Sequence, residues 1–126
     1  MKLKNLKKLK IYIASPYTLG DKIKNVRLQI DAFHILRDIG FIPIPPLTSH
    51  YINEVQERTH AEWLEYDFEI LRTCDMIVRI RPLDEYGKEI YSSGADMEEK
   101  EAKRLGLPYY EFKTLEEMKI FFENYE

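Results

Sequence analysis

The chain has 126 residues, enough for one domain with a buried core and too few for two. Its net charge of −3 gives no basic field that would indicate nucleic-acid binding. No apolar run reaches the roughly 18 residues of a membrane span, and the basic start lacks the apolar core of a signal peptide. The lone Cys74 excludes an internal disulfide, and no Cys/His cluster has zinc spacing. We therefore expect a single cytoplasmic domain over 1–126, with no membrane or nucleic-acid partner.

The first half of the chain predicts two strands, two helices and a long loop. The strands are β-branched and aromatic runs, and the helices carry apolar residues at spacings of three and four. Asp21 and Thr59 are placed to begin the two helices, and Gly40 closes the first. Such a long loop in a small domain is often functional. In chain order we expect a strand at 9–15, a helix at 22–39 with Val26, Ile30, Phe33 and Leu36 on one face, a strand at 41–44, an irregular stretch at 45–58, and a helix at 59–73.

The second half continues the alternation. We expect a strand at 75–80, a polar loop at 81–91, a helix capped by Ser92 or Ser93 and ending at Gly106, a strand at 107–112, and a last helix capped by Thr114. This order predicts an α/β protein, a flavodoxin- or Rossmann-like three-layer sandwich around a mainly parallel sheet of about four to five strands. Ligands of such sheets bind beyond the carboxyl ends of the strands, where the three long loops should gather.

Glu98 interrupts the apolar face of the third long helix, which it shares with Ala95, Ala102 and Leu105. Because this face must pack on the sheet, the Glu98 carboxylate should point along the sheet toward the strand ends. The positive end of the helix would favour its ionised form. A half-buried, oriented carboxylate suits attack on an electrophilic carbon. The alternative is a border residue whose carboxylate reaches water.

Further candidates lie at the same edge or next to it. Ser92, Ser93 and Gly94 offer hydroxyls and free amides at a helix start, which is typical of a phosphate site, although a plain helix cap has the same pattern. Asp75 precedes the third strand and is either part of the site or a turn residue. His50 lies in the long loop, where it is either a ligand contact or incidental.

The order of motifs is more specific than any one of them. The segments "IYIASPY", "GFIPIPP", "WLEYDFEILRTCDMIVR", "SSGADMEEKEA" and "GLPYY" follow one another between residues 9 and 110. Together they resemble the nucleoside 2-deoxyribosyltransferase superfamily, which includes 2′-deoxynucleoside 5′-monophosphate N-glycosidases and uncharacterised phage and bacterial branches. The family's core motif, S/D-x-G-x-x-x-E-x-x-x-A, is matched by Ser92, Gly94, Glu98 and Ala102.

The resemblance implies roles for these residues. Glu98 would attack the anomeric carbon of the sugar, and Asp75 would handle a proton or orient the sugar. A serine at the position of Ser92 is typical of the branch that binds a 5′-phosphate, together with Ser93 and Gly94. The first loop would hold the base or sugar through Ser15 and Tyr17, and His50 falls where some hydrolases carry a ligand-facing histidine.

The resemblance also implies cleavage of an N-glycosidic bond by hydrolysis or base transfer. The substrate would be a small nucleoside or nucleotide, with no cofactor or metal. A homo-oligomer, dimer or larger, is expected, for which Trp63, Tyr66 and Phe68 could supply an interface or simply core contacts. Asp96 departs from the glycine common in the hydrolases and would alter the phosphate site. The alternatives are a non-catalytic nucleotide-binding module on the same fold and, with less support, a flavodoxin-like regulatory domain.

Overall fold

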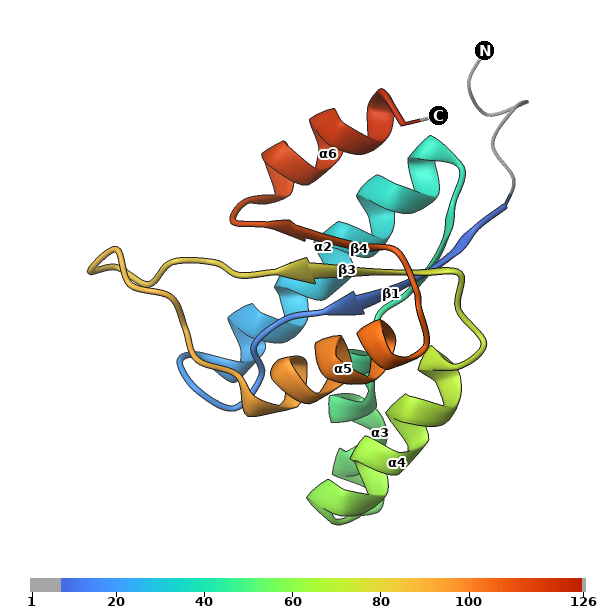
Figure 1. Ribbon diagram of the computed structural model, residues 1–126. Helices are drawn as coiled ribbons and strands as arrows, with labels where there is room; N and C mark the ends of the chain where they lie inside the picture. Colours follow the sequence, from blue (N-terminus) through green and yellow to red (C-terminus); the bar gives the residue numbers. More distant parts are fainter. Residues whose placement is uncertain (1–7, 126) are drawn as a thin grey trace.

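The computed structural model describes residues 8–125, which form a three-layer α/β sandwich (Figure 1). Its sheet has four parallel strands in the order β2-β1-β3-β4. The predicted fold class is therefore confirmed, with every strand pair parallel. The strands are β1 (Lys10–Ala14), β2 (Ile42–Ile44), β3 (Met76–Ile80) and β4 (Tyr109–Phe112). Helices α2 (Lys22–Ile39) and α6 (Leu115–Glu123) cover one face, and α3 (Ser49–Val55), α4 (His60–Leu71) and α5 (Ser93–Arg104) lie on the other.

Alternation along the strands divides the core into two parts. Successive side chains of a strand point to opposite faces of the sheet. Ile11 and Ile13 of β1 therefore pack with α2 and α6, whereas Tyr12 and Ala14 face α4 and α5. In β3 the same alternation directs Arg79, together with Ile77, toward the α5 face. Tyr12 and Arg79 are thus the polar residues of the strands whose side chains face α5.

The helix ends follow the predicted capping chemistry. The Asp21 carboxylate accepts from the amides of Ile23 and Lys24, and the Thr59 hydroxyl accepts from the amide of Glu62. Gly40 ends α2 at a φ of 123°, a backbone conformation that glycine adopts without steric cost. The four long helices therefore begin within a residue or two of the predicted positions.

The buried face of α2 differs from the predicted one. Val26 and Leu36 are fully buried as expected, but Ile30 and Phe33 are only half-buried. Asn25 and Gln29 occupy the buried face instead. Apolar spacing missed them because their polar groups are satisfied by backbone atoms of the loops that α2 supports, as described below.

The stretch at 45–58, expected to be irregular, is largely helical. A 3-10 turn at Pro46–Thr48 leads directly into α3, and Gln56 ends that helix. No residue of α3 is buried, and Tyr51, Ile52 and Val55 are exposed. Without a stripe of apolar side chains facing the core, the sequence carried no helical periodicity to detect.

Among residues 8–125, none of the helices combines the length and apolar character needed to cross a bilayer. The basic start of the chain, at residues 1–7, lies outside the described residues.

Candidate functional site

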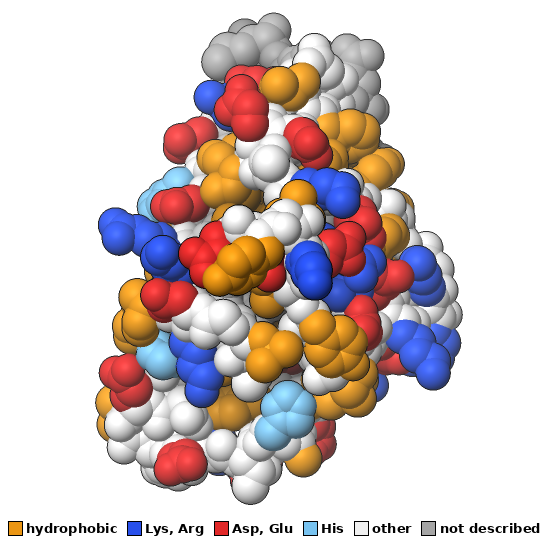
Figure 2. All heavy atoms as spheres, turned by 90° about the vertical axis from the view of Figure 1, so that its left-hand side faces the viewer, with side chains coloured by type: hydrophobic (Ala, Val, Ile, Leu, Met, Phe, Trp, Pro, Cys, Tyr) orange, Lys and Arg blue, Asp and Glu red, His pale blue; other side chains and the backbone are white. Residues whose placement is uncertain are grey.

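A cavity of about 340 Å³ opens at the carboxyl edge of the sheet. Its walls come from the loop after β1, from α3 and α4, and from the first turns of α5. This volume suits a small-molecule ligand. Figure 2 views the molecule from this edge, where acidic, basic and hydrophobic side chains are interspersed. The prediction that the loops following the strands gather at the carboxyl edge of the sheet is therefore confirmed.

Glu98 projects from α5 into this cavity and is only 7% exposed. Its neighbours on the helix face, Ala95 and Ala102, pack on the sheet, as the helix geometry predicted. The hydroxyl of Tyr12, a fully buried residue of β1, donates a hydrogen bond to Glu98 Oε2. A strand and a helix therefore fix the carboxyl group between them. Tyr12 was not singled out from the sequence because a tyrosine in a buried strand looks like ordinary core.

The protonation of Glu98 differs from the prediction. The pKa of Glu98 is raised from its ordinary value of 4.5 to about 8, mainly by burial and to a smaller extent by the negative charge of Asp67. The hydrogen bond from Tyr12 and the charge of Arg79 lower the pKa, but burial outweighs them. The expectation that the helix terminus holds Glu98 ionised is therefore wrong, because desolvation is the larger effect.

Asp67 of α4 is a second carboxyl group on the cavity, and the sequence did not point to it. Burial raises the pKa of Asp67 from 3.8 to about 7. Its Oδ1 atom is buried and has no hydrogen-bond partner among residues 8–125. Asp67 follows Trp63 by four residues, so the two share a helix face, and that spacing was the available signal. Two carboxyl groups that titrate near neutral pH thus face one cavity, an arrangement typical of functional sites.

The start of α5 presents free donors to the cavity. The Ser92 hydroxyl caps the helix by accepting from the Ala95 amide at 3.1 Å. Within the described chain, the amides of Ser93 and Gly94 form no hydrogen bond. A Cβ atom added to Gly94 would meet nothing within 4 Å, so the space above it is open. None of the described residues that line the cavity is Lys or Arg, although His50 and His60 are among them. At the start of α5, an anion would therefore be held by hydroxyls and amides.

Three further predicted residues line the cavity. The Tyr17 hydroxyl lies 2.6 Å from His50 Nδ1, and His50 Nε2 lies 3.1 Å from Glu54 Oε1. His50 Nδ1 is therefore engaged by Tyr17, whereas Nε2 is buried beside Glu54 and forms no hydrogen bond among residues 8–125. Ser15 is buried, and its Oγ accepts from Gln29 Nε2 at 2.9 Å. Ser15, Tyr17 and His50 are thus brought together with Glu98, Ser92, Ser93 and Gly94.

Two buried side-chain amides of α2, those of Asn25 and Gln29, hold the segments that form the cavity walls. Gln29 donates to Ile13 O and accepts from the Leu47 amide at 3.0 Å, which ties the end of β1 to the turn after β2. Asn25 donates to Tyr17 O and Leu19 O and so fixes the first loop. Like Glu98, these residues are polar groups on an apolar helix face, and the same reasoning would have identified them.

Asp75 is not part of the cavity. It precedes β3 at the amino edge of the sheet, where its Oδ2 accepts from the Lys10 amide at 2.8 Å. The cavity lies at the opposite, carboxyl edge, because parallel strands present all their ends in one direction. The placement of Asp75 beside Glu98 is thus corrected, and its contacts give it a structural role that joins the starts of β1 and β3. The adjoining Cys74 is buried, which raises the pKa of its thiol to about 11.

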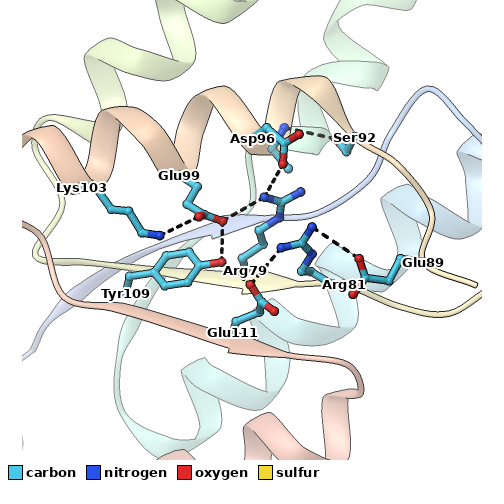
Figure 3. Close-up of polar contacts among 10 residues, drawn as sticks. Arg79, Arg81, Glu89, Ser92, Asp96, Glu99, Lys103, Tyr109 and Glu111 are labelled. Atoms are coloured by element: carbon cyan, nitrogen blue, oxygen red, sulfur yellow. Dashed lines mark hydrogen bonds and ion pairs between the residues drawn. The ribbon is translucent and has the colours of Figure 1, made fainter.

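An ion-pair network holds the other side of α5 on the sheet (Figure 3). Arg79 Nη1 of β3 lies 2.6 Å from Asp96 Oδ1 and 2.9 Å from Glu99 Oε1. Lys103 and Tyr109 also contact Glu99. Asp96 does not line the cavity, and its charge is compensated by Arg79. The expected effect of Asp96 on a phosphate site therefore has no geometric basis.

The aromatic residues of α4 separate into different environments. Trp63 lines the cavity, and its indole Nε1 donates to Asn53 Oδ1 at 2.8 Å. Tyr66 is 52% exposed, and Phe68 is half-buried. Trp63 therefore belongs to the cavity wall. Among the described residues, no three His, Cys, Asp or Glu side chains converge as a metal site would require.

Comparison with known proteins shows a similarity to solved structures. No family model matches the sequence, and no curated protein matches it. Among solved structures, the chain is similar to a 2-deoxyribosyltransferase from the psychrotolerant bacterium Bacillus psychrosaccharolyticus, with a TM-score of 0.61 and 23% sequence identity. The match covers 93% of this chain and 92% of that chain. The chain therefore shares its fold with that 2-deoxyribosyltransferase over nearly the whole length of both proteins.

Proposed function

We propose that the protein cleaves the N-glycosidic bond of a nucleoside 5′-monophosphate or a deoxynucleoside, by hydrolysis or by transfer to a second base. The observation that carries this proposal is the buried carboxyl group of Glu98, fixed by Tyr12 inside a cavity of about 340 Å³. The shared fold with a 2-deoxyribosyltransferase supports the same class of chemistry. A carboxyl group used only for structure would not be held in an open cavity at the cost of desolvation.

Glu98 acts as the nucleophile in this proposal. One carboxylate oxygen bonds to C1′ of the sugar while the bond from C1′ to the base nitrogen breaks, and the electron pair leaves with the base. Water or a second base then attacks C1′ and releases Glu98, as in retaining glycosidases. Tyr12 keeps the carboxylate oriented through Oε2 during both steps.

The raised pKa of Glu98 fits this mechanism. With a pKa of about 8, Glu98 is ionised in roughly a tenth of the protein molecules at pH 7. Positive charge develops on the sugar as the base departs, and it stabilises the carboxylate form in the transition state. A poorly solvated carboxylate is also a more reactive nucleophile than one surrounded by water. Ionisation of Glu98 makes activity rise with pH, and the need for a protonated Asp67 on the same cavity makes it fall again, so activity should be highest between about pH 7 and pH 8.

Asp67 replaces Asp75 as the proton donor in this proposal. It faces the same cavity as Glu98, and its pKa of about 7 lets it hold a proton at neutral pH and give it up to a departing base. Its unpartnered Oδ1 atom is available to a ligand. Ser92, Ser93 and the open space above Gly94 would receive the 5′ end of the substrate.

We also propose that the chain forms a homo-oligomer, dimer or larger. Several large apolar side chains of α3 and α4 beside the cavity are exposed, with Tyr51 at 48%, Ile52 at 58%, Val55 at 90% and Tyr66 at 52%. Such a group of exposed apolar residues is typical of an interaction surface. Sedimentation velocity at several protein concentrations will give the assembly state, and a monomer at all concentrations would contradict this part.

The test is a panel of ribo- and deoxyribonucleosides and their 5′-monophosphates, with free base measured by chromatography. We expect base release from at least one member and a loss of at least about 1,000-fold in Glu98→Ala, which should still bind the substrate. Gly94→Ala distinguishes the two substrate forms, because its methyl group enters open space where a phosphate would sit. It should slow 5′-monophosphates and spare nucleosides. Binding by the wild type without base release would instead favour a nucleotide-binding module.

A further inference from the structure

Two hydrogen-bond donors next to Asn53 of α3 determine the orientation of its side-chain amide. Its Oδ1 atom lies 2.8 Å from the backbone nitrogen of Arg58 and 2.8 Å from Trp63 Nε1. Both of these groups can only donate a hydrogen bond. The atom that meets them must therefore be the amide oxygen, and the amide cannot rotate by half a turn without losing both bonds.

The amino group of Asn53 is consequently left facing away from these donors. No acceptor among residues 8–125 bonds to Nδ2, and Nδ2 is not among the buried polar atoms that lack a partner. Asn53 lines the cavity. Its two N–H groups are therefore free to donate to a ligand there.

The other polar groups on this wall lack the same fixed direction. His50 Nδ1 is bonded to Tyr17, and His50 Nε2 is buried beside Glu54 and so does not reach a ligand. The indole N–H of Trp63 is used by Asn53 itself. The Ser49 hydroxyl also lines the cavity, but a hydroxyl rotates and can donate or accept. Asn53 is thus the oriented donor of the wall formed by α3 and α4.

This wall is where a base would lie if the proposed function is correct, and the inference rests on that function. Glu98 must reach C1′, and the start of α5 would take the 5′ end of the sugar, so both occupy the α5 side of the cavity. The base then extends toward α3 and α4, where the Trp63 ring, with its N–H already bonded, offers an apolar face for stacking.

We propose that Asn53 selects for bases that present a carbonyl oxygen to its amino group and against bases that present an amino group at the same position. A base amino group would place donors against donors and leave the Asn53 N–H groups unpaired, which is costly in a cavity. The protein should therefore favour substrates that carry uracil over those that carry cytosine, and substrates that carry hypoxanthine over those that carry adenine. Within each pair the ring is the same size, and the main change is an oxygen in place of an amino group.

The experiment compares these pairs as substrates and as ligands. For the wild type, we expect kcat/KM to be at least about tenfold higher for deoxyuridine than for deoxycytidine and for deoxyinosine than for deoxyadenosine, tested as nucleosides and as 5′-monophosphates. The same preference should appear in dissociation constants measured by calorimetry with Glu98→Gln, which binds without turnover. The binding measurement keeps the inference testable even if no base is released, in which case the proposed function fails separately.

Asn53→Asp is the decisive variant because a carboxylate can accept from Arg58 and Trp63 as the amide oxygen does. It replaces only the two donors with an acceptor, so the preference should fall at least tenfold or reverse toward the amino bases. Asn53→Ala should abolish the preference, and thermal unfolding will show that both variants are folded. A wild type that binds both members of each pair equally would overturn the proposal, as would an Asn53→Asp variant with an unchanged preference.

Discussion

Two neighbouring glutamates on α5 have opposite acid–base behaviour. Glu98 faces the cavity, and its burial raises its pKa to about 8, whereas the pKa of Glu99 is lowered to about 2. Glu99 is also partly desolvated, but hydrogen bonds from Lys103, Tyr109 and Arg79 outweigh that cost. The hydrogen-bonding partner of Glu98 is the hydroxyl of Tyr12, and none of the ion pairs formed by residues 8–125 involves Glu98.

The difference shows what separates a carboxylate held for structure from one held for reaction. On the Glu99 side of the helix, each negative charge meets a positive one, and the network ties α5 to β3 (Figure 3). On the Glu98 side, a carboxyl group is desolvated and its charge is left without a full partner. A ligand that develops positive charge could supply that partner. The three changes below test this comparison.

The largest expected effect is that of Glu98→Gln on stability at alkaline pH. The pKa of Glu98 in the folded protein lies above its ordinary value of 4.5, so the wild type loses stability as the pH rises from about 4.5 to about 8. Glutamine cannot ionise, and its oxygen can still accept from Tyr12. We expect the variant to be more stable than the wild type by roughly 2–4 kcal/mol at pH 8 and nearly equal to it at pH 4.

Urea unfolding at these two pH values measures the difference. If Glu98→Gln were equally or less stable at pH 8, the carboxyl group would not be buried without a compensating charge. A gain in stability together with lost base release would link the cost of burial to function.

A smaller effect, a loss of stability, is expected when the ion-pair network on the other side of α5 loses its central cation. Arg79 is almost completely buried, so Arg79→Met should destabilise the protein by roughly 2–3 kcal/mol at pH 7, less than a fully buried pair because Asp96 is partly exposed. The matched control is Arg81→Met, since Arg81 is more exposed and pairs with Glu89 and Glu111. The control should cost less than about 1 kcal/mol. Equal losses in both variants would show that burial of Arg79 does not matter.

The smallest effect is expected for Glu99→Gln. The pKa of Glu99 is lowered below its ordinary value, so its ion pairs stabilise the fold above about pH 4.5, and this contribution is lost as the pH falls toward 2. Since Lys103 reaches solvent, we expect a loss of about 1 kcal/mol at pH 7 that disappears near pH 2. Thermal unfolding of both proteins between pH 2 and pH 7 will show whether the variant loses or gains stability. A gain in stability at pH 7, as expected for Glu98→Gln, would contradict the contrast between the two residues.

Local patterns in the sequence were sufficient to predict the elements whose apolar residues face the core. The strands, the four long helices and their caps at Asp21, Thr59, Ser92 and Thr114 follow from such patterns. Helix α3 was missed because none of its residues is buried. Asn25 and Gln29 were missed because apolar spacing alone defined the buried face of α2, although both are polar residues on that face that bond the loop after β1 and the end of β1.

The candidate site also has one part that the sequence predicted and another that only the fold decided. The sequence by itself determined that Glu98 sits on a core-facing helix surface, because 3.6-residue periodicity is a local property. Only the tertiary structure decided which groups Glu98 meets. Parallel strands and crossing helices bring Tyr12 and Asp67 to the cavity, and the same topology carries Asp75 to the opposite edge of the sheet. The protonation of Glu98 was also decided there, since desolvation depends on what surrounds a carboxyl group in three dimensions rather than on its place along a helix.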